Sequence, residues 1–202
     1  MLKKIFILVI LFSIFPVNQA FSQKRCYNIK DKKILFALDC LKDTDGEWAV
    51  NAIMGENDID EPIKVEFKNL KKISPNFTND DALGWKDEYG KLMIFINEKH
   101  CNAPLPALAA LICHESVHQD SENSIQEETY AWAYEAEVWH QLKEKFPELK
   151  TYSAGQNALV DRENIIENMY IRSNFSPTIL EQKIRNHPSY KNLPENSPGF
   201  GN

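Results

Sequence analysis

Hydrophobic and polar positions in the first half of the chain predict two helices. In residues 31–42, DKKILFALDCLK, apolar side chains recur every three or four residues, which is the spacing of one helix face. That face consists of Ile34, Leu35, Leu38 and Leu41. A shorter helix is expected over residues 48–54, WAVNAIM, inside a polar passage that continues to about residue 62.

Alternation of apolar and polar residues predicts the strands. Residues 63–67, IKVEF, alternate in this way and predict one strand. Residues 82–86 and 91–97 predict a hairpin that turns at the sequence EYG. The stretch SPNFTNDD, residues 74–81, is expected to be a loop because it is rich in turn-forming residues.

The second half of the chain has a helical pattern. Pro104 opens a segment that runs to about Asp120 and is apolar on nearly every side from Leu105 to Cys113, so this helix is expected to be central and buried. Further helices are expected over residues 124–146, 155–172 and 177–186. Together the elements predict an α+β fold, in which a small antiparallel or mixed sheet packs on a helical subdomain around the central helix.

The N-terminus has the pattern of an export signal. Lys3 and Lys4 precede an apolar run over residues 5–15, and small residues follow at Ala20 and Ser22. This pattern predicts a secretory signal peptide over the first 22 residues. A membrane anchor is the alternative, but a span needs about 20 apolar residues. We therefore expect a secreted or periplasmic protein without stable membrane insertion after removal of the signal.

Cleavage of this signal would leave a single domain over residues 23–190 and a Pro- and Gly-rich tail, residues 191–202, that we expect to be loose. It would also remove two lysines, so that 21 basic and 29 acidic residues remain and the net charge falls from −6 to −8. This charge argues against a nucleic-acid partner, because phosphate binding needs basic patches.

Four cysteines, an even number in a chain expected to be exported, suggest disulfide bonds. A bridge between Cys101 and Cys113 is disfavoured, because a helix that begins near Pro104 would carry Cys113 about 14 Å along its axis. Cys113 is therefore expected to be buried and free, or bonded to Cys26 or Cys40. The absence of a C-x-x-C pair argues against a cysteine-based zinc knuckle.

The segment LICHESVHQD, residues 111–120, carries the strongest chemical signal. His114 and His118 are four residues apart, so on a helix both imidazoles can face one metal ion. Glu115 lies toward the same side, where it can hold a water molecule. Two histidines satisfied inside a core are the alternative, but burying them with a carboxylate is costly unless a cation is their partner. A catalytic zinc has three protein ligands and an open position, so a third ligand is needed.

The next helix offers Glu127, Glu128 and Glu135 as the third ligand. Ser124 and Glu127 fit the capping pattern S-x-x-E, in which Glu127 would reach back to the start of its own helix. If the two helices are antiparallel, Glu128 lies level with the histidines and Glu135 lies about 10 Å further on. We predict Glu128 as the ligand, with Glu127 in reserve. Glu135 is expected to support the site or join an internal ion pair, a partly exposed charge being the alternative.

HESVH on one helix and ETYAW on the next resemble the gluzincin metallopeptidases, whose downstream ligand is a glutamate often followed three residues later by alanine. The similarity covers about residues 104–140. It implies a zincin-like fold with the edge of an antiparallel sheet beside the active-site helix. Residues 91–97, KLMIFIN, are a candidate for this edge, which could pair with an extended peptide. Only ten residues separate His118 from Glu128, as in compact members of the group.

These features predict an exported zinc metallopeptidase that acts on a peptide or protein substrate. Zn²⁺ held by His114, His118 and Glu128 would polarise the substrate carbonyl, and Glu115 would act as general base. His187, after the last helix, is a second catalytic candidate that could steady the oxyanion, although an exposed loop histidine would have no such task. The other candidates for this contact are Tyr130, Tyr134, Tyr152 and Tyr170.

Two other functions stay open at this point. A zincin-like protein could bind or inhibit a partner without catalysis, although such a protein would have no use for Glu115. A zinc hydrolase could also act on an amide that is not part of a protein, such as one in a cell wall, with the same residues.

Overall fold

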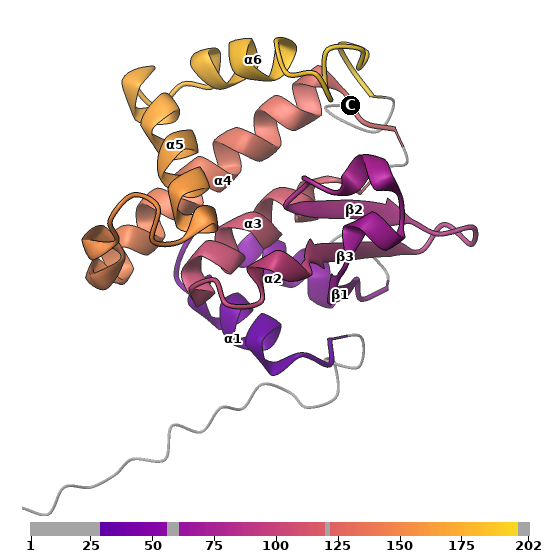
Figure 1. Ribbon diagram of the computed structural model, residues 1–202, viewed down its shortest axis with the longest axis horizontal. Helices are drawn as coiled ribbons and strands as arrows, with labels where there is room; N and C mark the ends of the chain where they lie inside the picture. Colours follow the sequence, from indigo (N-terminus) through magenta and orange to yellow (C-terminus); the bar gives the residue numbers. More distant parts are fainter. Residues whose placement is uncertain (1–28, 56–60, 120–121, 198–202) are drawn as a thin grey trace, which may run out of the picture.

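Figure 1 shows the computed structural model of the protein, in which residues 29–55, 61–119 and 122–197 are described. The export signal expected at the N-terminus and Cys26 lie outside these ranges. The described residues form helices and one three-stranded sheet, which confirms the α+β class. Within the same ranges, no helix combines the length and the apolar character that crossing a membrane requires.

Helices α1 (Lys32–Cys40) and α2 (Glu47–Met54) lie close to their predicted positions. Asp31 caps α1, because its carboxylate accepts a hydrogen bond from the backbone N–H of Lys33. Gly55 ends α2 in the left-handed region, with φ of 75°, where glycine is favoured. The predicted apolar face of α1 is buried against the core, apart from one leucine that is only partly covered.

The sheet is mixed and small. Its strands are β1 (Lys64–Lys68), β2 (Ala82–Lys86) and β3 (Leu92–Asn97), in the order β1-β3-β2. β2 and β3 form the predicted antiparallel hairpin, whereas β1 is parallel to β3. The expectation that residues 91–97 form the edge is therefore wrong, because β3 is hydrogen-bonded on both sides. The edge strand that contacts α3 is β2.

Helix α3 (Leu105–Val117) is the centre of the molecule. Every residue from Pro106 to Val117 is buried, as predicted. In Figure 1, α3 runs between the sheet with α1 and α2 on one side and α4 on the other. The helix ends before the predicted Asp120, since His118 has a non-helical backbone with φ of −78° and ψ of 84°. His118 therefore follows the helix instead of lying within it.

The other side of α3 is covered by α4 (Ile125–Lys145) and α5 (Ala158–Arg172), and α6 (Thr178–Arg185) packs on these two helices. Ser124 caps α4 as predicted, because its hydroxyl accepts from the backbone N–H of Glu127. The remaining short elements are 3-10 helices at Leu70–Lys72, Pro75–Phe77, Glu98–His100 and Pro147–Thr151. Helices α4, α5 and α6 contact one another and form the helical part of the molecule above α3 in Figure 1.

The C-terminal segment differs from the loose tail expected from residue 191 onward. Pro194 and Glu195 accept hydrogen bonds at their carbonyls from the first backbone amides of α4, and Ser197 is buried. We call residues 194–197 the C-terminal strap. Residues 198–202 lie outside the described part of the chain.

The described cysteines are free thiols. Cys40 and Cys113 are buried and Cys101 is exposed. The predicted burial of Cys113 is confirmed, and of its two predicted states the structure shows the free one. Burial raises the pKa of the Cys113 thiol well above its usual range, so this side chain behaves as a small apolar group in the core.

Candidate metal centre

His114, His118 and Glu128 come together as the sequence predicts. The Nε2 atoms of the two imidazoles are 3.3 Å apart. Glu128 reaches in from α4, with Oε2 at 3.7 Å from Nε2 of His114 and Oε1 at 3.7 Å from Nε2 of His118. The three side chains offer ligand atoms that all lie within 4.8 Å of one another. The arrangement is a compact set of two nitrogen donors and one carboxylate.

The spacing of these atoms fits a tetrahedral metal ion. Two imidazole nitrogens bound at 2.0–2.1 Å with tetrahedral angles would be about 3.3–3.4 Å apart, and the Nε2 atoms of His114 and His118 already have this separation. The carboxylate of Glu128 would need to move inward by a few tenths of an ångström. Its Oε2 is buried without a hydrogen-bond partner among the described residues, which is costly unless a cation is bound there.

A carboxylate lies behind each histidine. For His114 it is Glu135, whose Oε2 lies 3.1 Å from Nδ1. Burial would raise the pKa of Glu135, but Arg162 and His114 outweigh this effect and lower it to about 2, so the group is ionised. An anion at Nδ1 favours the tautomer that leaves Nε2 free for a metal. The predicted supporting place of Glu135 is confirmed, and the alternative of a partly exposed charge is wrong because the residue is fully buried.

Arg162 of α5 connects this carboxylate to the sheet. Its guanidinium forms a two-bond pair with Glu135, and its Nε lies 3.1 Å from Oδ2 of Asp81. Asp81 directly precedes β2 and also contacts Nε2 of His100 at 2.7 Å. His114 is thus the end of a chain of charges that starts at the fully buried Glu135 and runs through the half-buried Arg162 and Asp81 to the beginning of the edge strand.

The carboxylate behind His118 is Glu127. Its Oε1 lies 2.9 Å from Nδ1 of His118, so the expected return of Glu127 to the start of its own helix is wrong. The backbone N–H of Ser124 is instead bonded by the side chain of Asn123. Burial would lower the pKa of His118, but Glu127 and the neighbouring carboxylates of Glu128 and Glu115 raise it to about 9. A metal ion that bound His118 would therefore have to displace a strongly held proton from its imidazole.

Asn123 also supports the third ligand, because its side-chain amide donates to Oε1 of Glu128. Asn123 was not among the residues predicted from the sequence. Its signal was weak, since an asparagine just before a helix cap usually serves only the local turn. The amide holds one oxygen of Glu128 and leaves the other, unpaired oxygen for a cation.

Glu115 is a residue of α3 and lies beside the three proposed metal ligands. It is 7% exposed, and burial raises the pKa of its carboxyl, as do the charges of Glu128 and Glu135, while the two histidines oppose the shift. The edge strand passes close to it at Gly84, where a Cβ atom would lie 3.6 Å from Oε2 of Glu115. A glycine inside a strand pattern can signal such a close approach.

The oxyanion candidates occupy different surroundings. His187 follows α6 as expected, is half-buried, and contacts the ring of Tyr190 at a centroid distance of 4.9 Å. Burial raises the pKa of Tyr190, and the charges of Glu128 and Glu115 raise it further. Tyr190 was absent from the candidates drawn from the sequence. Of those candidates, Tyr134 instead donates to the carbonyl of Asp45.

Comparisons with known proteins do not assign a function to this site. A scan against protein-family models, a search of curated proteins and a search of solved structures each found no match. A function for this chain therefore has to be inferred from the arrangement of its two histidines and four carboxylates.

Proposed function

We propose that the protein is an exported zinc-dependent metallopeptidase with a zincin-like arrangement of its site. The observation that carries this proposal is the convergence of His114, His118 and Glu128 around one point, with Glu115 buried next to them. Two imidazoles and one carboxylate are a donor set typical of catalytic zinc, in which a fourth position stays open for water and substrate.

The metal would supply Lewis-acid activation of a carbonyl group and of a water molecule. Glu115 would accept the proton of the attacking water and would pass this proton to the leaving amine. Tyr190 and His187, which pack against each other, are the candidates for donating a hydrogen bond to the developing oxyanion. Tyr190 is favoured because the charges of Glu128 and Glu115 act on its phenol and raise its pKa.

The edge strand β2 supports a peptide as the substrate. Among the described residues β2 pairs only with β3, so the backbone groups along its other side are available to an extended chain. Gly84 brings this strand close to Glu115 and His118. A peptide that paired with β2 would therefore pass the general base with its backbone in an extended conformation.

Replacement of Glu115 by glutamine tests the proposal. Glu115→Gln should retain one zinc ion per chain and lower kcat/KM by at least about 100-fold, which is the usual contribution of a general base. Metal content by mass spectrometry and cleavage of a mixed peptide library measure the two effects. Glu144→Gln, on an exposed part of α4, makes the same change of charge far from the proposed chemistry and should leave both values unchanged.

Three outcomes would contradict the proposal in different ways. A native protein without bound zinc would refute the metal site. Zinc binding without cleavage of any peptide would favour a non-catalytic binding protein or a hydrolase for another amide. Full activity in Glu115→Gln would exclude this residue as the base.

A further inference from the structure

We infer that the C-terminal strap, residues 194–197, is a working part of the metal centre, in which Ser197 positions His118 through Glu127. The inference rests on the metal site of the proposed function but not on its peptidase activity. Ser197 would be a positioning residue, and it lies 79 positions after His118 in the sequence.

The contacts form a continuous chain from the strap to the ligand. The hydroxyl of Ser197 donates to Oε2 of Glu127 at 2.8 Å, and Oε1 of the same carboxylate lies 2.9 Å from Nδ1 of His118. Ser197 and Glu127 are 3% and 2% exposed, so water does not readily replace either contact. Because both oxygens of Glu127 have a partner, the carboxylate plane is held in one orientation.

The strap is anchored where α4 begins. The first backbone amides of a helix have no partner inside the helix. Those of Ile125 and Gln126 donate to the carbonyls of Pro194 and Glu195, at 2.9 Å and 3.1 Å. These bonds align the strap with the first turn of α4, which is the turn that carries Glu127. Ser197 is therefore brought to Glu127 by backbone pairing and not by its side chain alone.

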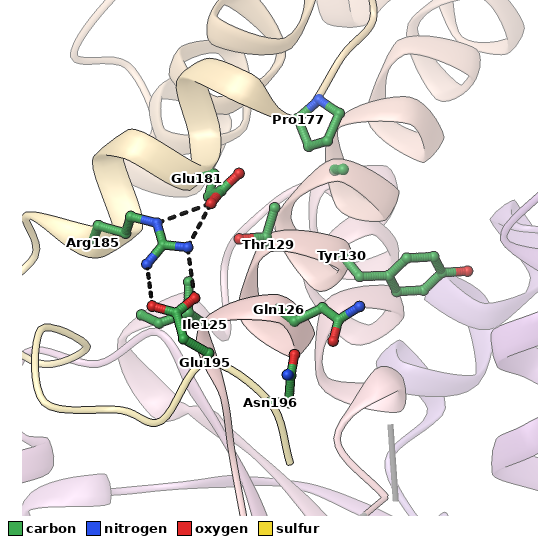
Figure 2. Close-up of a pocket in the computed structure, with 10 residues that line it drawn as sticks. Ile125, Gln126, Thr129, Tyr130, Pro177, Glu181, Arg185, Glu195 and Asn196 are labelled. Carbon is green, nitrogen blue, oxygen red and sulfur yellow. Dashed lines mark hydrogen bonds and ion pairs between the residues drawn. The ribbon is translucent and has the colours of Figure 1, made fainter. Parts of the chain in front are cut away.

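A second clasp holds the strap from the side of α6. Figure 2 shows Arg185 of α6 between the carboxylates of Glu195 and Glu181. The two bonds from Arg185 to Glu195 measure 2.6 Å and 2.7 Å. Glu195 and Asn196 also line a cavity of about 380 Å³ between α4 and α6. This side of the strap therefore faces the cavity instead of the hydrophobic core. The clasp and the helix start together determine where Ser197 lies.

His118 needs such a support more than His114 does. Its backbone lies outside α3, so the helix does not determine the direction of its side chain. Without the Ser197 hydroxyl, Oε2 of Glu127 would lose its donor and the carboxylate could turn away from Nδ1. Loss of a direct carboxylate partner weakens metal binding by roughly 10- to 100-fold, and a group one contact further out should have a smaller effect.

The test compares three variants of the full-length protein. Ser197→Ala should weaken zinc binding by roughly 3- to 10-fold, as measured by competition with a chromophoric chelator, and should alter the visible spectrum of bound Co²⁺. Ser197→Thr keeps a hydroxyl and should restore most of the affinity. Ser153→Ala removes an exposed serine hydroxyl outside the strap and should match the native protein.

The outcomes separate this inference from the proposed function. Native zinc affinity and an unchanged Co²⁺ spectrum in Ser197→Ala would refute the inference and leave the peptidase proposal intact. A Ser197→Thr variant as weak as Ser197→Ala would also refute it, because packing and not the hydroxyl would then be responsible. A native protein that binds neither metal would refute the metal centre, and both proposals with it.

Discussion

The surroundings of His114 and His118 differ although both imidazoles face the same point. His114 lies inside α3, and the buried carboxylate behind it, Glu135, is paired with the guanidinium of Arg162. His118 lies just beyond the helix, and the carboxylate behind it, Glu127, receives a neutral hydroxyl from the C-terminal strap. One ligand is held by compensated charges within the core, and the other by a carboxylate with a neutral donor near the chain end.

This difference separates stability from metal affinity. The charge of the fully buried Glu135 is balanced by Arg162, so loss of Arg162 would leave this carboxylate without its cation in the core. Among the residues that the structure describes, the carboxylate of Glu127 forms an ion pair only with the imidazole of His118, and it helps to raise the pKa of His118 to about 9. A more basic imidazole is a stronger metal ligand. We therefore expect the His114 side to control folding and the His118 side to tune metal binding.

The largest effect is expected on the His114 side. Arg162→Met should lower the free energy of unfolding of the metal-free protein by about 3–5 kcal/mol, because Glu135 and Asp81 would lose their shared partner. Urea unfolding followed by circular dichroism measures this loss. Arg185→Met removes a solvent-exposed clasp and should cost less than about 1 kcal/mol. Equal losses of stability in Arg162→Met and Arg185→Met would contradict the expectation that the His114 side controls folding.

An intermediate effect is expected on the His118 side. Glu127→Gln keeps an oxygen near Nδ1 but removes the negative charge, so zinc affinity should fall about 10-fold while the free energy of unfolding changes by less than about 1 kcal/mol. Chelator competition and urea unfolding report the two quantities, with Glu144→Gln as the matched control. A loss of stability as large as that of Arg162→Met would show that both sides serve folding alike.

The smallest effect on zinc affinity is expected at Gly84 of the edge strand β2, which passes close to His118. In Gly84→Ala the new Cβ would lie 3.2 Å from Cβ of His118, which must shift slightly. Zinc affinity should fall by roughly two- to threefold, which is less than 1 kcal/mol, and chelator competition can resolve it. Gly90→Ala, where a Cβ meets nothing within 4 Å, should not change zinc affinity. Unchanged affinity in Gly84→Ala would mean that His118 tolerates displacement and needs little support.

Much of the fold could be predicted because the information was local. Periodicity located α1, the β2–β3 hairpin and α4 to within a few residues of their observed ends. Strand order could not be read in this way, because β1 pairs in parallel with β3 across the intervening chain and makes β3 the central strand. The end of α3 before His118 was also missed, since no glycine or proline marks it.

The sequence by itself determined the donor set and its spacing, namely two histidines four residues apart, a carboxylate between them and Glu128 on the next helix. Local chain geometry suffices for this, because residues close in sequence have few ways to face one another. Only the tertiary structure decided which groups hold those donors in place, since Arg162 and Ser197 reach them from distant elements. Their contacts depend on how whole helices and the chain end pack, and no local pattern records that packing.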